Sequence, residues 1–173
     1  MARYRRANVA GGSYFFTVVA AQRQAILTDP ALRAALHEAV VKVRAARPFR
    51  IDAWVLLPDH LHTIWTLPAD DADFSTRWRL IKSQVTQACG ASYVRPDLQT
   101  EQRLQKQCGT IWQHRYWEHL LRDEVDVSQH LDYVHWNPVK HGLVTSVKDW
   151  PWSSFHRYVA QGAYPADWCV APT

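Results

Sequence analysis

The chain has little cysteine, and none of it forms a recognisable framework. Cys89, Cys108 and Cys169 are odd in number, lie far apart and include no CxxC pair. A scattered set of this kind argues against a zinc knuckle or a disulfide scaffold and favours a reducing compartment. The sequence therefore predicts a cytoplasmic protein without structural cross-links.

Long apolar runs are also missing. No stretch approaches the roughly 20 apolar residues that a membrane span needs. The basic segment 1–12 is not followed by an apolar run of the signal-peptide type, and no internal repeat or low-complexity segment is visible. We therefore expect no membrane partner and no tandem architecture.

Apolar and aromatic residues are abundant. The 173 residues are 47% apolar and include nine Trp, which argues against disorder and is enough for one buried core. We expect one domain over residues 1–173, with a catalytic core at about 14–142 and a tail at 143–173.

The formal charge of +4 is modest, but the positive residues gather in two places. The two groups are Arg3, Arg5 and Arg6 near the start, and Arg77, Arg79 and Lys82 on a stretch with helical spacing. Such clusters suit a polyanionic partner. The alternative is an ordinary solvated surface.

The pattern of apolar residues predicts an α+β fold. Strands are expected at 14–20, 49–57, 60–67 and 117–122, and helices at 30–47, 74–89 and 124–137, with a short one at 153–160. Ser75 is a plausible N-cap, residues 91–110 read as a loop, and Pro138 should end the third helix. The order β-α-β-β-α-β fits a ferredoxin-like split βαβ sandwich, an antiparallel sheet with helices on one face. An added helix follows the last strand, and the tail is helical.

A His-Leu-His triplet marks the candidate site. His60 and His62 fall in a predicted strand, so the two imidazoles share one face while Leu61 takes the other. Two neutral imidazoles held in this way form half of a metal site. The alternative is a pair of half-exposed strand residues.

A second pair lies far downstream. Tyr133 and Asn137 are four residues apart in a predicted helix, so the phenol and the amide share a face. If the two pairs meet, the site combines a metal with a tyrosine nucleophile, as cleavage of a phosphodiester through a covalent link requires. Otherwise Tyr133 is a core tyrosine with its hydroxyl bonded.

Motifs in order along the chain resemble those of the REP-associated tyrosine transposases, relatives of the single-tyrosine HUH transposases of bacterial insertion sequences. The motifs are Leu56–His62, Lys82-Ser83, Trp112-Gln113, Trp117-Glu118-His119, Tyr133–Gly142 and Trp150–Tyr158. The resemblance runs from about Tyr14 to Trp168, nearly the whole chain.

The resemblance implies a metal-dependent enzyme that acts on DNA. By motif, His60, His62 and Asn137 are ligands of a divalent metal, magnesium or manganese, and Tyr133 is the nucleophile. The family's substrate is single-stranded DNA with repetitive extragenic palindromic (REP) hairpins, cut beside a short guide tetranucleotide. The product is a 5′-phosphotyrosine, from which a free 3′-hydroxyl can rejoin strands. Nitrogen ligands by themselves suit zinc or manganese better than magnesium.

Contacts with DNA are expected at several basic residues. Lys82, Arg79 and Lys140 should meet phosphates, with Arg5 and Arg6 as further candidates. Trp136 or Trp65 could stack on unpaired bases. We expect a monomer that keeps its tyrosine in cis, with a dimer that exchanges the tyrosine helix as the alternative.

Three other interpretations stay open. The first is a phosphodiesterase that uses a metal-bound water and in which Tyr133 is only structural. The second is a noncatalytic nucleic-acid-binding module on the same scaffold. The third is a different metal site drawn from His119, His130, His135 and His141, whose irregular spacing argues against it.

Overall fold

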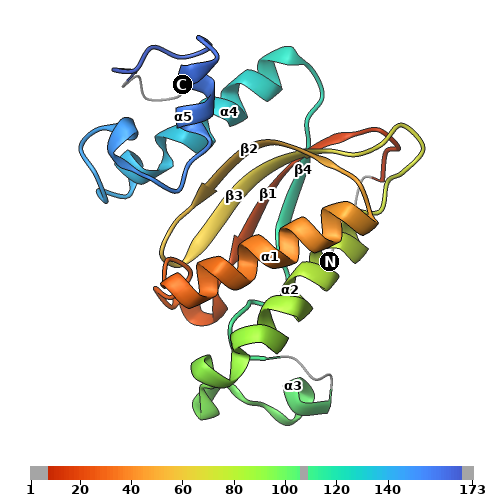
Figure 1. Cartoon of the computed structure of the whole chain (residues 1–173). Coiled ribbons are helices and arrows are strands. Elements are labelled where there is room, and N and C mark those ends of the chain that lie inside the picture. Colours follow the sequence, from red (N-terminus) through yellow and green to blue (C-terminus); the bar gives the residue numbers. More distant parts are fainter. Residues whose placement is uncertain (1–7, 106–108, 169–173) are drawn as a thin grey trace, which may run out of the picture.

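The computed structural model describes residues 8–105 and 109–168 (Figure 1). Nine helices and strands follow one another along these residues. They are β1 (Ser13–Val19), α1 (Pro30–Ala46), β2 (Arg50–Leu56), β3 (His60–Thr66), α2 (Phe74–Cys89), α3 (Glu101–Gln105), β4 (Trp117–Leu120), α4 (Glu124–Lys140) and α5 (Phe155–Ala160). Short 3-10 turns supplement them. None of these helices is both long enough and apolar enough to cross a bilayer.

The four strands form one antiparallel sheet in the order β2-β3-β1-β4. This is the strand order of the ferredoxin-like sandwich, so the predicted α+β class is confirmed. β2 and β3 are joined by a tight turn at Pro58-Asp59, closed by a hydrogen bond of 2.8 Å from the Leu57 amide to the His60 carbonyl. The turn delivers the chain directly into the strand that carries the paired histidines.

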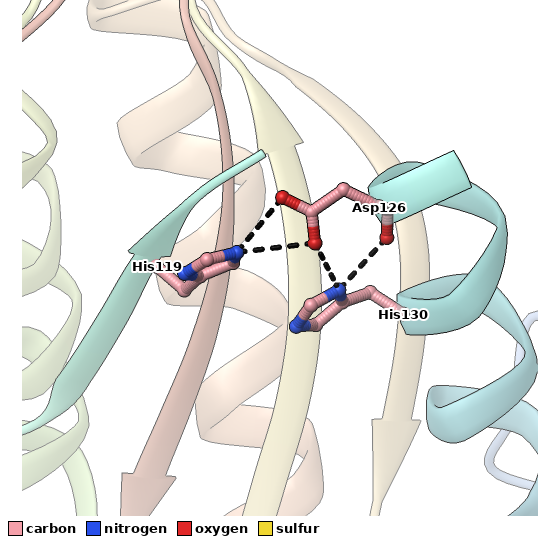
Figure 2. A group of neighbouring side chains, drawn as sticks. All are labelled: His119, Asp126 and His130. Carbon is pink, nitrogen blue, oxygen red and sulfur yellow. Dashed lines mark hydrogen bonds and ion pairs between the residues drawn. The ribbon is translucent and has the colours of Figure 1, made fainter. Parts of the chain in front are cut away.

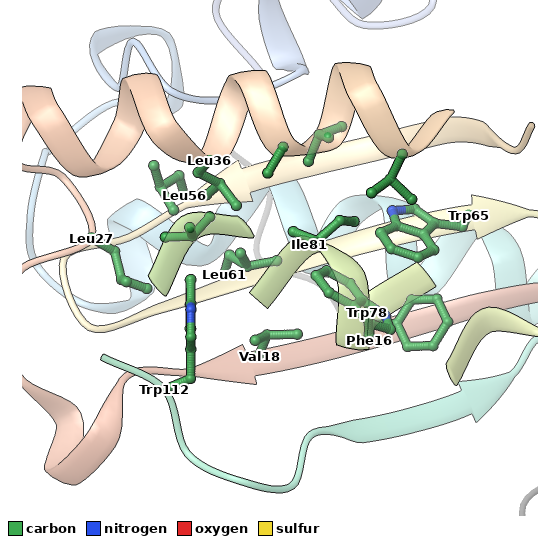
Figure 3. Close-up of a cluster of buried hydrophobic side chains, with 14 of the residues drawn as sticks. Phe16, Val18, Leu27, Leu36, Leu56, Leu61, Trp65, Trp78, Ile81 and Trp112 are labelled. Carbon is green, nitrogen blue, oxygen red and sulfur yellow. The ribbon is translucent and has the colours of Figure 1, made fainter. Parts of the chain in front are cut away.

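One face of the sheet packs on α1 and α2, the helical layer of the sandwich (Figure 3). Its core is aromatic: the Trp65 indole from β3 stacks on that of Trp78 from α2, with centroids 4.2 Å apart. Leu61, the middle residue of the triplet, is fully buried in the same cluster. The expectation that Trp65 stacks on DNA bases is therefore wrong, because its exposed fraction is 0%.

The opposite face packs on α4, the helix added after the last strand. Phe15, Val55 and Ile64 from the sheet form a second buried cluster with Val134 of the helix. The alternation of side chains along a strand explains the division, since Phe15 and Phe16 point to opposite faces. The triplet therefore turns both histidines toward α4 and the leucine toward α1 and α2.

α4 runs past the residue at which the sequence predicted its end. Pro138 lies inside the helix, which ends at Lys140. A proline in the last turn removes a single amide donor, so the helix can continue for a few residues. Gly142, with φ of +67°, then reverses the chain, and the Leu143 amide bonds to the Pro138 carbonyl at 3.0 Å. The extra turn places Lys140 on the helix and His141 at its C-cap.

Two other local expectations are corrected. The N-cap of α2 is Asp73 rather than Ser75, because the Asp73 carboxylate accepts the Thr76 amide hydrogen at 2.9 Å. The segment 91–110 is not a plain loop, since it contains 3-10 turns and the short helix α3. Both features depend on contacts that periodicity does not reveal.

Candidate active site

The paired histidines lie on β3, a central strand, and are almost fully buried under α4. Each has an exposed fraction of 4%, and their ring centroids are 4.8 Å apart. They share a face because they alternate with Leu61, as the strand assignment predicted. Burial in this position keeps solvent away from both imidazoles.

Each imidazole is oriented through one ring nitrogen. His62 Nδ1 lies 2.8 Å from the Thr17 hydroxyl on β1, and His60 Nδ1 lies 2.6 Å from the Asp59 carboxylate. Asp59 in turn accepts a hydrogen bond of 2.9 Å from Arg23. Such partners fix the orientation of each ring and leave its Nε2 for a ligand. The Asp59 carboxylate, an acceptor, also requires the proton of His60 to be on Nδ1.

The surroundings of His62 favour its neutral form. Burial lowers the pKa of His62 well below its ordinary value, and the nearby charges of His60 and His141 lower it further. Burial by itself would raise the pKa of Asp59, but the hydrogen bond and charge of His60 and the Arg23 guanidinium together lower it. A neutral imidazole is the form that binds metals, so the lowered pKa of His62 suits a ligand.

α4 brings the second pair over the first. The Tyr133 ring meets the His62 ring edge to face, with centroids 5.2 Å apart. Asn137, one turn further along, has an exposed fraction of 0%. Its Nδ2 makes a long hydrogen bond of 3.4 Å to the Tyr133 carbonyl. The phenol and the imidazole couple therefore meet within a single chain.

Two residues that follow Asn137 by three and four positions, Lys140 and His141, complete the surroundings of the site. Lys140 places its ammonium 3.5 Å from the Tyr133 hydroxyl and 4.6 Å from the ring centre. His141 packs on His60 with centroids 5.1 Å apart, and burial, followed by the charge of His60, lowers its pKa. We did not single out His141 for this site from the sequence, although its position four residues after Asn137 is the signal that could have done so.

The donor set fits a divalent cation. Nε2 of His62 and Oδ1 of Asn137 are buried and have no hydrogen-bond partner. Buried polar atoms normally have one, so each of these two atoms is available to a ligand. Two imidazole nitrogens and an amide oxygen are suitable first ligands for manganese or magnesium and leave positions for phosphate and water.

A second histidine cluster lies near the start of α4 (Figure 2). His119, Asp126 and His130 offer ligand atoms within 4.8 Å of one another. However, the carboxylate already lies 2.9 Å from His119 Nε2 and 3.0 Å from His130 Nδ1, and the two rings stack at an interplanar angle of 17°. The three side chains therefore already form a hydrogen-bonded clamp between β4 and α4.

The predicted DNA contacts are only partly gathered at this site. Lys140 lies beside Tyr133, whereas Arg79 and Lys82 are on α2, which packs on the other face of the sheet. Lys82 Nζ donates to the Gln113 carbonyl at 2.6 Å. Arg5 and Arg6 lie outside the described residues.

Two further residues that the sequence suggested for DNA contacts, Arg77 and Trp136, pack against other parts of the protein. Arg77, grouped with Arg79 and Lys82 as a polyanion contact, is 1% exposed and bonds to Asp71 at 2.7 Å, so it serves the fold instead. Trp136 is half-buried and packs against Trp168.

A ferredoxin-like sheet with paired histidines on a central strand, lying under a tyrosine-bearing helix, defines the class of single-tyrosine HUH enzymes that process DNA. Comparisons with known proteins identify the family within that class. A REP-associated tyrosine transposase of Escherichia coli (strain K12) is 48% identical over 168 residues, which are 97% of this chain and 91% of the relative. The chain therefore belongs to the REP-associated tyrosine transposase family, and it is an enzyme of the DNA transposase and endonuclease type.

A solved structure agrees with this assignment. The structure of a REP-associated tyrosine transposase bound to a REP hairpin matches with a TM-score of 0.83 at 47% sequence identity. The match covers 100% of this chain and 94% of that one. No protein-family model matches the chain.

Proposed function

We propose that this protein cuts and rejoins single-stranded DNA beside REP-type hairpins through a 5′-phosphotyrosine formed on Tyr133. The observation that carries the proposal is the contact of the Tyr133 ring with His62, at 5.2 Å, in one chain. The hairpin bound in the solved relative supports the substrate class.

We assign the divalent cation to His60, His62 and Asn137. The support is the pair of buried, partnerless acceptors at His62 Nε2 and Asn137 Oδ1. When bound, a magnesium or manganese ion would neutralise charge on the non-bridging phosphate oxygens, which otherwise repel a nucleophile. Thr17 and Asp59 hold the imidazoles in the orientation this needs.

The chemistry assigned to Tyr133 is an in-line displacement. The phenol gives up its proton as its oxygen forms a bond to phosphorus. The bond from phosphorus to the 3′-oxygen breaks, and that oxygen takes up a proton and leaves as a 3′-hydroxyl, so no net proton is gained or lost. The ammonium of Lys140, 3.5 Å from the Tyr133 hydroxyl, favours negative charge at the attacking oxygen and on the phosphate. The phosphodiester energy is kept in the adduct, so a second 3′-hydroxyl can reverse the step without ATP.

The test uses a labelled single strand that carries a REP-type hairpin and its flank, with manganese. We expect an adduct that survives denaturation, with Tyr133→Phe abolishing the adduct while binding is kept. Tyr93→Phe is the matched control, because the Tyr93 hydroxyl bonds to Asp29 away from the site.

The same assay separates the rival mechanisms. His62→Ala should lose cleavage and adduct together, whereas His37→Ala, an exposed histidine on α1, should lose neither. Cleavage that persists in Tyr133→Phe would instead indicate a metal-bound water as nucleophile. Binding without any cleavage in the parent protein would reduce the protein to a DNA-binding module.

A further inference from the structure

Trp117 is an exposed aromatic side chain at the edge of the sheet. Its exposed fraction is 53%, and no other aromatic residue in the described ranges 8–105 and 109–168 falls in the exposed class. Exposing an indole to water is unfavourable, and the other Trp rings of these ranges are buried or half-buried. The exception therefore needs a reason.

The register of the sheet places Trp117 in line with the active site. Trp117 on β4 pairs with Thr17 on β1, and Thr17 pairs with His62 on β3. All three point to the same face, and the hydroxyl of Thr17 touches the His62 ring. Two strand spacings, about 10 Å, separate the backbone of Trp117 from that of the histidine.

Aromatic contacts connect the Trp117 indole to the candidate active site. The Phe15 ring makes an edge-to-face contact with Trp117, with centroids 5.7 Å apart, and another with Tyr133 at 5.8 Å. A ligand that covers the indole therefore lies one ring away from the candidate nucleophile.

The Trp117 indole is held in place by a row of neighbouring rings. The His119 ring lies parallel to the indole, at an interplanar angle of 6° and 5.8 Å between centroids, and stacks on His130 at 4.8 Å (Figure 2). Asp126 bonds to both imidazoles, which fixes the row. A surface ordered in advance loses little entropy when it binds a flat ligand.

The charges nearby suit a nucleic-acid backbone at the ends of β4. Arg115, just before the strand, and Arg122, just after it, are both exposed. Arg122 lies 4.0 Å from the Asp126 carboxylate, so Arg115, two residues before Trp117, is the exposed cation nearer to the indole in sequence. Exposed aromatic rings beside cations form the usual surface for an unpaired base, because every base has a flat π-face.

We propose that Trp117, backed by His119, stacks on an unpaired base of the DNA strand next to the bond that Tyr133 attacks. The inference rests on the proposed function, since it names the contact that would position the strand there. It assigns a base-binding role to the β4 edge, which sequence reasoning placed on other tryptophans.

The test measures binding separately from chemistry by using Tyr133→Phe throughout. Two ligands are compared by fluorescence anisotropy: a REP-type hairpin with its single-stranded flank, and the same hairpin without the flank. Trp117→Ala should weaken binding of the flanked hairpin about tenfold, equivalent to about 1.4 kcal/mol, and leave the bare hairpin unchanged. Val125→Ala, at a 66% exposed residue of α4, is the control and should change neither.

Two conservative variants test stacking itself. Trp117→Phe keeps an aromatic face and should bind nearly as the parent, while Trp117→Leu keeps bulk without the face and should bind as Trp117→Ala. The proposal would be overturned if Trp117→Leu and Trp117→Phe bound the flanked hairpin equally well. It would also be overturned if Trp117→Ala weakened binding of the flanked and the bare hairpin by the same factor. Thermal melting of each variant separates loss of fold from loss of contact.

Other outcomes distinguish this inference from the function on which it rests. A change of sedimentation on Trp117→Ala would assign the indole to a second copy of the chain and overturn the proposal. If the parent with Tyr133 intact forms no adduct, the proposed catalytic role fails, while a selective loss on the flanked ligand still supports stacking.

Discussion

At the scale of single residues, Asn137 combines two properties that rarely coincide. Its exposed fraction is 0%, and its Oδ1 has no hydrogen-bond partner. An unsatisfied buried acceptor costs about 1–3 kcal/mol, which a protein tolerates where the atom has another use. Ligation of a cation is the use that we assign to it.

Replacing Asn137 with Leu should therefore have opposite effects on the fold and on metal binding. The substitution removes a buried polar atom that bonds poorly and keeps the volume similar. We expect the melting temperature of the metal-free protein to stay the same or rise, while the increase caused by manganese disappears. Differential scanning fluorimetry with and without manganese measures both.

The comparison with His62→Ala makes this result interpretable. That variant should also lose the manganese effect, because it removes another of the proposed ligands. A lower melting temperature for metal-free Asn137→Leu, together with an undiminished response to manganese, would mean that Asn137 is structural and not a ligand.

At the scale of elements, Arg77 ties the start of α2 to the segment between α1 and β2. Its guanidinium is buried and donates to the carbonyls of Arg47 and Pro48, at 3.2 and 2.8 Å. Asp71 supplies the carboxylate at 2.7 Å. Within residues 8–105 and 109–168, Asp71 is the one carboxylate paired with Arg77. A buried cation without a paired carboxylate is left uncompensated, which is far more costly than loss of a surface ion pair.

Asp71→Asn should lower the free energy of unfolding at pH 7 by about 3 kcal/mol. This value is at the lower end of the range for breaking a buried ion pair, because the Asp71 side chain is itself partly exposed. The hydrogen bond from Arg77 holds the pKa of Asp71 below its usual value. The contribution of the pair is therefore present above about pH 4 and is lost as the pH falls through the lowered pKa. Urea unfolding of parent and variant between pH 7 and pH 3 measures this effect. The difference between their free energies of unfolding should become smaller at acidic pH.

The exposed pair of Arg95 and Asp97 provides the control for that experiment. Its two side chains are 46% and 56% exposed, so Asp97→Asn should unfold as the parent does at every pH. A difference for Asp71→Asn that stays constant down to pH 3 would show that the charge of Asp71 is not what stabilises the fold.

The helices and strands also show how much of the fold could be predicted from the sequence. Periodicity and turn residues were enough to place the strands and the main helices, and the His-Leu-His alternation gave the correct face for each residue. The end of α4 was mispredicted because the residue before a proline usually avoids helical backbone. The turn beyond Pro138 is nevertheless closed by the amides of Gly142 and Leu143, which bond to Val139 and Pro138. The face on which α4 packs depends on contacts far apart in sequence, so it was not predictable from spacing.

The same limit applies to the site. Four residues, His60, His62, Tyr133 and Asn137, were identified because strand and helix periods bring each pair to one face. Their roles remain predictions, while the contact between the pairs is observed. The location of Arg79 and Lys82 on the far side of the sheet could not be read from charge, because charge clusters carry no information about which face a helix presents.

At the scale of the whole molecule, the central question is whether one chain is sufficient for catalysis. The Tyr133 ring touches His62 of the same chain, and α4 packs on β2 and β3 through the cluster around Val134. The clamp of His119, Asp126 and His130 adds a polar link between β4 and the start of the helix. Both features hold the nucleophile in cis, so we expect a monomer to be active.

Mixing two inactive variants tests that expectation directly. Tyr133→Phe lacks the nucleophile, and His62→Ala lacks a proposed metal ligand. If the site is built in cis, a mixture of the two contains no complete site, so no adduct should form at any protein concentration. If α4 is exchanged between subunits, mixed dimers contain one complete site, and the adduct should reach up to about one quarter of the parent level after statistical subunit exchange. Adduct formation that rises with protein concentration would therefore replace the monomer by a helix-exchanged dimer without affecting the role of Tyr133.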